Sequence, residues 1–151
     1  MGGTVMVDVK PIGKNEYDDW YRLWQGYLKF YNASLSDDIS KNNWSRFHDA
    51  SEPVFALGAY REGTLVGFVH YLYHRTNWSL NDGCYLQDLY AAPAARGTGV
   101  GRALIEAVYD AAKKNKSATV YWLTQEDNKT ARLLYNRIGG VSGFVHYEKL
   151  L

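Results

Sequence analysis

The sequence is short of three features, and each absence excludes a class of protein. Its one cysteine, Cys84, excludes an internal disulfide framework, and no CxxC pair or Cys/His cluster has zinc-ligand spacing. Lys and Arg number 17 against 16 Asp and Glu, so the net charge of +1 gives no excess that would attract nucleic acid. No apolar run could cross a bilayer, and residues 1–6 lack both an apolar signal core and the serine or threonine of a myristoylation motif. We therefore expect a cytoplasmic protein with no metal site and with neither nucleic acid nor a membrane as partner.

The sequence does contain enough apolar residues for one folded core. With 46% hydrophobic and 15% aromatic residues, its 151 residues can bury a core but are too few for two ordinary domains. We expect one domain that spans residues 1–151.

Hydrophobic periodicity predicts strands first and then strands that alternate with helices. Strands are predicted at residues 5–9, 54–60, 65–73, 84–91, 118–123 and 144–150, with Pro11 breaking the first one. Large side chains at helical spacing from Trp20 to Tyr31 predict one helix, and other patterns predict helices at 37–48, 100–116 and 128–138. With no repeat or linker, this order predicts a single mixed α/β sheet covered by helices.

The turn after strand 84–91 carries the strongest chemical signal. Glycines at 97, 99 and 101 lie between Arg96 and Arg102, where the strand leads into a helix. Glycine lets the backbone approach a ligand closely, and the first N–H groups of a helix have no internal partner, so this turn can hold a pyrophosphate. A dinucleotide fingerprint would need glycine at position 102 or 104, where the chain has Arg102 and Leu104, and a Walker loop would need Gly-Lys-Ser/Thr. Both of those phosphate loops are therefore excluded.

Two blocks of the sequence resemble the GNAT superfamily of acetyltransferases. The first, Arg96-Gly97-Thr98-Gly99-Val100-Gly101, resembles the R/Q-x-x-G-x-G/A signature of the family. The second, residues 128–139, reads NKTARLLYNRIG and resembles its N-x-x-A-x-x-L-Y-x-x-x-G stretch. Overall the chain is similar to the branch that holds yeast histone and polyamine acetyltransferases and diamine acetyltransferases. The resemblance implies a mixed, mostly antiparallel central sheet with helices on both faces and a splay between the middle strands.

The same resemblance implies which residues bind acetyl-CoA. The turn would hold the pyrophosphate through Arg96, Gly97, Thr98, Gly99, Val100, Gly101 and Arg102. The strand end formed by Leu89, Tyr90 and Ala91 would splay from its neighbour, so that its free backbone groups bind pantetheine and one N–H meets the acetyl oxygen. Asn128 would touch the coenzyme arm or order water beside it, although capping a helix explains that residue equally well.

Acetyl transfer to an amine requires one proton to leave the ammonium and another to reach the departing thiolate. Tyr135 is the candidate acid, because a phenol with a reference pKa near ~10 is protonated at neutral pH and the resemblance gives the matching tyrosine this role. Asp88 is the candidate base, as the carboxylate nearest the active strand, and a purely structural role explains it as well. Diamine acetyltransferases have an acidic residue where this chain has Gln87. This difference argues against a carboxylate that acts directly as the base and against a preference for polyamines. We expect structural roles for the histidines and for Cys84.

Aromatic residues dominate the region expected to bind the acceptor. The first two helices and strand 83–90 supply the candidate binding residues Trp24, Tyr27, Tyr85 and Gln87. This composition predicts a small amine as substrate: a polyamine, a diamine or an amino acid. The alternatives are a lysine in a protein or histone tail as acceptor, a non-catalytic module that binds acetyl-CoA, and a binder of nucleotide phosphates. The resemblance also implies a homodimer or higher homo-oligomer, paired through the segment from Phe144 to Leu150.

Overall fold

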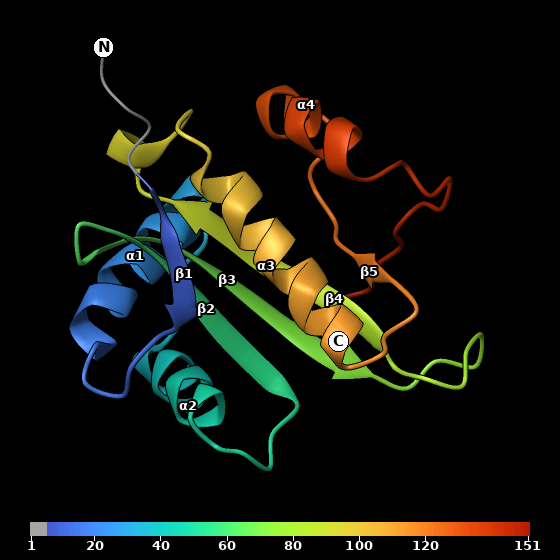
Figure 1. The fold of residues 1–151 in the computed structure, drawn as a ribbon, viewed down its shortest axis with the longest axis horizontal. Helices are drawn as coiled ribbons and strands as arrows, with labels where there is room; N and C mark the ends of the chain where they lie inside the picture. Colours follow the sequence, from blue (N-terminus) through green and yellow to red (C-terminus); the bar gives the residue numbers. More distant parts are fainter. Residues whose placement is uncertain (1–5) are drawn as a thin grey trace.

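The computed structural model describes residues 6–151 and contains one five-stranded sheet (Figure 1). The strands follow the sequence order across the sheet: β1 (Asp8–Pro11), β2 (Val54–Arg61), β3 (Thr64–His74), β4 (Gly83–Ala91) and β5 (Val120–Tyr121). All neighbours are antiparallel except β5, which is parallel to β4. The helices are α1 (Tyr17–Phe30), α2 (Asp37–Phe47), α3 (Val100–Lys114) and α4 (Lys129–Ile138). The expected mixed, mostly antiparallel sheet is confirmed.

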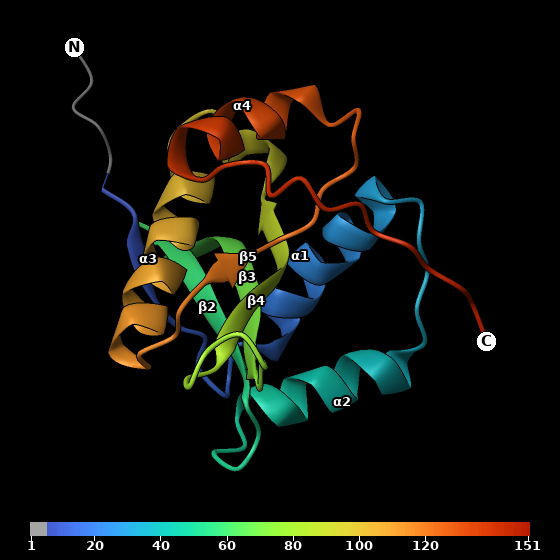
Figure 2. The same cartoon turned by 90° about the vertical axis from the view of Figure 1, so that its right-hand side faces the viewer.

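Helices cover both faces of the sheet. Figure 2 shows the sheet between α3 on one side and α1 with α2 on the other. The apolar stripe of α1 buries Trp20, Leu23, Trp24 and Leu28 against one face. Leu104, Ile105 and Val108 of α3 are fully buried against the other face. Each amphipathic helix thus covers one side of the sheet, as its hydrophobic spacing predicts.

The sheet opens between β4 and β5. These strands pair only where Cys84 meets Val120 and Tyr85 meets Tyr121, so β4 from Leu86 onward has no strand partner on that side among the described residues. On its other side β4 pairs with β3 along almost its whole length. The splay implied by the resemblance is confirmed, and it leaves backbone N–H and C=O groups of β4 free.

Three predicted strands differ from the observed ones. Val5 lies outside the described residues, and the first strand runs to Pro11, which pairs with Leu57 at the sheet edge, where proline's missing N–H costs no ladder hydrogen bond. The predicted strand 118–123 is reduced to the two residues of β5, because the chain leaves the sheet at the splay. The predicted last strand, 144–150, does not form, since none of the five strands found within residues 6–151 pairs with this segment.

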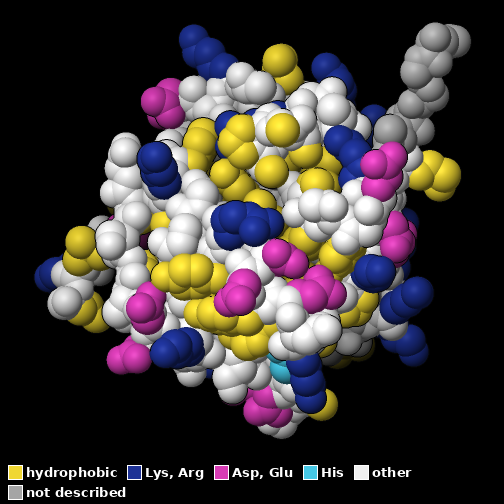
Figure 3. All heavy atoms as spheres, turned by 90° about the vertical axis from the view of Figure 1, so that its left-hand side faces the viewer, with side chains coloured by type: hydrophobic (Ala, Val, Ile, Leu, Met, Phe, Trp, Pro, Cys, Tyr) yellow, Lys and Arg dark blue, Asp and Glu magenta, His cyan; other side chains and the backbone are white. Residues whose placement is uncertain are grey.

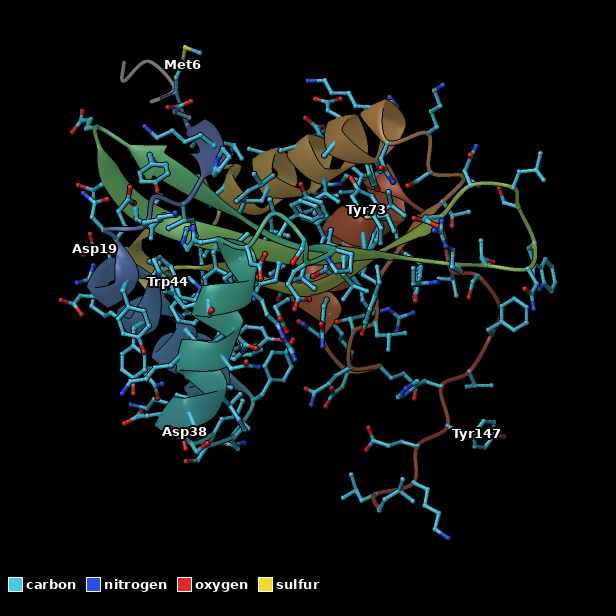
Figure 4. The ribbon with its side chains drawn as sticks, turned by 90° about the horizontal axis from the view of Figure 1, so that it is seen from below. Met6, Asp19, Asp38, Trp44, Tyr73 and Tyr147 are labelled. Carbon is cyan, nitrogen blue, oxygen red and sulfur yellow. The ribbon has the colours of Figure 1, made fainter. Side chains whose placement is uncertain are left out.

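The C-terminal segment instead extends away from the body of the molecule. Phe144, Tyr147 and Leu150 are 83%, 90% and 85% exposed. Figure 4 shows Tyr147 on this segment, directed away from the sheet and helices. The apolar residues that predicted a strand are therefore present but have no apolar partner within residues 6–151.

The described surface carries charged side chains of both signs. On the face shown in Figure 3, acidic and basic side chains are interspersed around groups of hydrophobic ones. Within residues 6–151, no helix is both long and apolar enough to cross a membrane. In the same range, no three His, Cys, Asp or Glu side chains come together as metal ligands.

Candidate functional site

A cavity of about 480 Å³ lies between the two N-terminal helices and the sheet, and we call it the α1–α2 cavity. In Figure 4 α2 lies beside α1 under the sheet, with Trp44 directed toward α1. Much of the cavity wall is apolar or aromatic. Its polar side chains include Tyr27, Asn43, Arg46, His70, Gln87 and Asp88. One carboxylate, one guanidinium and one imidazole thus face a compact, largely apolar space, as is typical of small-molecule sites.

Both carboxylate oxygens of Asp88 have a side-chain partner. Its Oδ1 accepts a hydrogen bond from the Tyr27 hydroxyl at 2.7 Å, and its Oδ2 lies 3.0 Å from His70 Nδ1. The Asp88 side chain is 15% exposed, so the carboxylate is largely enclosed but still reaches the cavity. Burial and the neighbouring carboxylate raise the pKa of Tyr27 well above its usual value, which keeps that hydroxyl protonated and donating.

A β-bulge explains why two consecutive residues of β4 reach the same cavity. Successive side chains of a regular strand point to opposite faces of the sheet. Here Asp88 pairs with His70 and Leu86 pairs with Tyr71, so Gln87 has no residue opposite it. The extra residue bends the strand locally, and both Gln87 and Asp88 line the α1–α2 cavity.

The predicted acceptor residues are only partly brought together. Trp24 and Tyr27 line the cavity from α1, and Gln87 lines it from β4. Tyr85 does not line it, because its ring stacks on Tyr121 at a centroid distance of 4.8 Å. From the sequence alone, Arg46 is not a candidate site residue and His70 is expected to be structural. The weak pattern of α2 could not identify the face that carries Arg46, and the bulge that brings His70 and Asp88 together has no local sequence signature.

The glycine turn has the backbone geometry that its sequence predicts. Gly97 and Gly99 have φ values of 74° and 91°, a conformation that favours glycine, and no atom lies within 4 Å of a Cβ built at either position. Gly99 is the N-cap of α3, and no side chain caps this helix end. Gly101 is the second residue of the same helix, and a Cβ at this position would be 3.7 Å from Leu134 of α4. The turn therefore presents open space and free helix N–H groups beside the free edge of β4.

Side chains around the turn already have protein partners. Arg96 donates to the Ala91 carbonyl at 3.2 Å and lies over the Tyr90 ring. Arg102 pairs with Glu106 at 2.8 Å on the surface of α3. The Thr98 hydroxyl donates to the Ala95 carbonyl and accepts from Arg61 at 2.8 Å. These contacts hold the side chains of the turn and leave its backbone N–H groups free. Val100 is buried in the core, and Leu89 is partly buried against the same core.

Tyr135 lies on α4, beyond the splay. Its ring is half-buried and meets Trp122 edge-on at 5.5 Å. Burial, with a smaller effect from Tyr31, raises the pKa of Tyr135 to about 12. Asn128 occupies the N-cap position of α4, but its side chain donates to Thr124 Oγ1 at 3.3 Å and accepts no capping hydrogen bond. The geometry thus gives no support to helix capping as the role of the Asn128 side chain.

Cys84 is fully buried in the core. Burial raises the pKa of its thiol to about 11, so the sulfur is protonated at neutral pH and is a poor nucleophile. The expectation of a structural cysteine is therefore supported by both its position and its chemistry.

Comparison with known proteins agrees with this geometry. Residues 17–140 match the family described as the acetyltransferase (GNAT) family. The sequence is 34% identical over 143 residues to the D-amino-acid N-acetyltransferase HPA3 of Saccharomyces cerevisiae, with 93% of this chain and 89% of that protein covered.

Solved structures share the fold at lower sequence identity. A ribosomal-protein-alanine N-acetyltransferase from Brucella melitensis biovar Abortus 2308 superposes with a TM-score of 0.79 at 20% identity, covering 97% of this chain and 100% of that one. The aminoglycoside enzyme AAC(6')-Iy, in complex with the bisubstrate analogue CoA-S-monomethyl-acetylneamine, superposes with a TM-score of 0.81 at 17% identity, covering 97% of this chain and 99% of that one.

Proposed function

Because this chain belongs to the acetyltransferase (GNAT) family and is thereby an acetyl-CoA-dependent N-acetyltransferase that acts on amines, we propose that its acceptor is a small primary amine held in the α1–α2 cavity. The observation that carries this proposal is the Asp88 carboxylate in the wall of a cavity of about 480 Å³. A cavity of this size suits a small molecule, and the faces of Trp24 and Tyr27 can attract a cation.

Among small amines, we favour an amino acid. Arg46 is the one basic side chain in the cavity wall besides His70, and within residues 6–151 it forms no ion pair. An amino acid carries an ammonium for Asp88 and a carboxylate for Arg46, whereas a diamine or polyamine would leave Arg46 facing a second cation. The similarity to an enzyme named for D-amino acids supports the same choice.

The residues around the splay suit the binding of acetyl-CoA, which supplies a thioester-activated acetyl group. The N-terminus of α3, with Gly97, Gly99 and Gly101 beside it, offers N–H groups and open space for the pyrophosphate. The free edge of β4 at Leu89, Tyr90 and Ala91 can pair with the amide groups of the pantetheine arm, and one N–H can bind the acetyl oxygen. Arg96, Thr98 and Arg102 shape or flank the turn, and Asn128 lies at the start of α4, where it can contact the coenzyme arm.

In the proposed mechanism the amine attacks directly within a ternary complex. Asp88 takes a proton from the bound ammonium, directly or through water, and so produces the neutral nucleophile. As the new C–N bond forms and the C–S bond breaks, the Tyr135 hydroxyl gives its proton to sulfur. The nitrogen's second proton returns to Tyr135 through solvent. The balance is one amide, one thiol and one proton released.

We also propose a homodimer or higher homo-oligomer, a cytoplasmic location and a domain that spans residues 1–151. Exposed apolar residues between Phe144 and Leu150 support association, because large exposed apolar groups usually mark a contact surface. A single buried cysteine suits a reducing compartment. Pairing of β1 with β2 extends the fold to residues before the family match at 17–140.

Thiol release from acetyl-CoA tests the proposed acceptor. The panel pairs amino acids of both hands with the corresponding decarboxylated amines, and adds a diamine, a polyamine and a histone-tail peptide. We expect an amino acid to give the highest kcat/KM, and Arg46→Ala to raise its KM roughly tenfold while leaving the KM of the decarboxylated amine unchanged.

Lys41→Ala provides the matched control, because Lys41 is exposed on the same helix but does not line the cavity. Turnover of the tail peptide alone would indicate a protein acetyltransferase. Binding of acetyl-CoA without turnover of any amine would indicate a non-catalytic module.

A further inference from the structure

A chain of hydrogen bonds runs from the buried core to the α1–α2 cavity. Trp20 Nε1 donates to His70 Nε2 at 3.0 Å, and His70 Nδ1 lies 3.0 Å from Asp88 Oδ2. The Trp20 side chain is fully buried and His70 is 5% exposed, so water has little access to either ring. Three elements, α1, β3 and β4, each contribute one member of this chain.

The indole of Trp20 determines which nitrogen of His70 carries the proton. An indole N–H can only donate, so His70 Nε2 must present its lone pair. The imidazole proton then lies on Nδ1, and His70 donates to Asp88. Accepting a second proton at Nε2 would break the bond to Trp20 and leave a buried cation, so His70 does not act as a general base.

Aromatic rings pack against the His70 imidazole on several sides. Its ring stacks on Phe68 at 4.5 Å and lies 4.6 Å from Phe47 and 5.4 Å from Trp24. Asp88 and Arg46 are the charged groups that share the cavity with it. The ring is thus held by aromatic contacts on several sides and directs one N–H at one carboxylate oxygen.

We propose that His70, with its tautomer set by Trp20, is a positioning residue that orients the Asp88 carboxylate to receive the acceptor's ammonium. This inference rests on the proposed function and identifies how that site is built. Tyr27 holds Oδ1 and His70 holds Oδ2, so both oxygens are restrained. Each oxygen can accept a second hydrogen bond, and those two remaining acceptor positions are available to an N–H of the substrate.

Two amide substitutions separate positioning from mere filling of space. In His70→Asn the side-chain amide lies where Nδ1 was, and it can still donate to Asp88. In His70→Gln the amide lies where Nε2 was, so it satisfies Trp20 but no longer reaches Asp88 Oδ2. A purely structural role would be rescued better by Gln, whereas a positioning role is rescued better by Asn.

The experiment measures amine KM and kcat at saturating acetyl-CoA, and amine binding by calorimetry without acetyl-CoA. We expect His70→Gln to lower kcat/KM for the amine by roughly 10- to 100-fold and His70→Asn to stay within about fivefold of wild type. Acetyl-CoA affinity should be unchanged in both. His74→Gln is the control, since His74 also lies on β3 and makes two hydrogen bonds, but does not line the cavity.

A long-range ¹H–¹⁵N spectrum of the wild-type protein at pH 7 supplies a readout independent of turnover. We expect a neutral His70 ring protonated at Nδ1. An Nε2-protonated ring, an imidazolium, or equal losses in the Asn and Gln variants would overturn the proposal. Absence of amine turnover in the wild-type protein would refute the proposed function instead, and the spectrum and the binding data would still test the positioning of Asp88.

Discussion

At the scale of single residues, burial keeps both the proposed acid Tyr135 and the thiol of Cys84 protonated. Tyr135 is half-buried beside Trp122, and the loss of solvent raises its pKa to about 12. A raised pKa keeps the phenol protonated, and an acid must be protonated in order to act. The same effect keeps Cys84 as a thiol and removes it as an acyl carrier.

Tyr135→Phe tests the assignment of the acid. We expect kcat to fall about 100-fold or more, because general acid catalysis typically contributes that factor, while amine KM changes little. Since the pKa of Tyr135 lies at about 12, the wild-type rate should rise with pH as the amine loses its proton, with no decline from Tyr135 below about pH 11.

Tyr109→Phe is the control for this substitution, because Tyr109 is another partly buried tyrosine near Trp122, and its hydroxyl donates to the Ile138 carbonyl. It should retain wild-type kcat. A Tyr135→Phe enzyme with undiminished kcat would show that sulfur receives its proton from another source.

At the scale of helices and strands, the sequence predicts an element well where its hydrophobic pattern is local. It does not predict features that depend on the neighbouring strands. The stripe of α1 is visible because its apolar residues recur at helical spacing. The pattern of α2 is weak, since Ile39 is 43% exposed and Ser40 is the helix's one buried residue. The shortness of β5 and the bulge at Gln87 depend on the partner strands, so no local pattern reveals them.

A substitution at Gly67 tests how tightly β3, β4 and α3 pack together beside the splay. A Cβ at this position would lie 2.8 Å from the Tyr90 carbonyl oxygen and 2.9 Å from Val100 Cγ1. Neither atom can move without shifting β4 or the start of α3. We expect Gly67→Ala to lower the free energy of unfolding in urea by about 1–3 kcal/mol and to weaken acetyl-CoA binding. Gly140→Ala, where a Cβ would meet no atom within 4 Å, should have little effect on either. A Gly67→Ala protein as stable as wild type would mean that this junction is loosely packed.

At the scale of the whole molecule, β4 joins the two halves of the site. Its bulge turns Asp88 into the α1–α2 cavity on one face, and its free edge after Leu86 faces the splay beside α3. The residues proposed to bind acetyl-CoA could be named from the sequence because most of them lie in two contiguous blocks. The proposed acceptor half could be predicted only in part: Asp88 is a candidate from the sequence, but Arg46 and His70 lie on other elements that only the folded sheet brings to it.

At the same scale, the C-terminal segment, residues 144–151, should provide the contacts that hold the oligomer together. Removing residues 144–151 should convert an oligomer into a monomer by light scattering after gel filtration, because exposed Phe144, Tyr147 and Leu150 supply apolar surface that has no partner within residues 6–151. The circular dichroism spectrum should change little, since this segment contributes no helix or strand to the fold. The double substitution Trp78→Ala and Leu80→Ala is the control, because these side chains are 90% and 104% exposed in the loop between β3 and β4. A wild-type protein that is monomeric, or a truncated one that keeps the wild-type mass per particle, would assign the exposed apolar residues to some other contact.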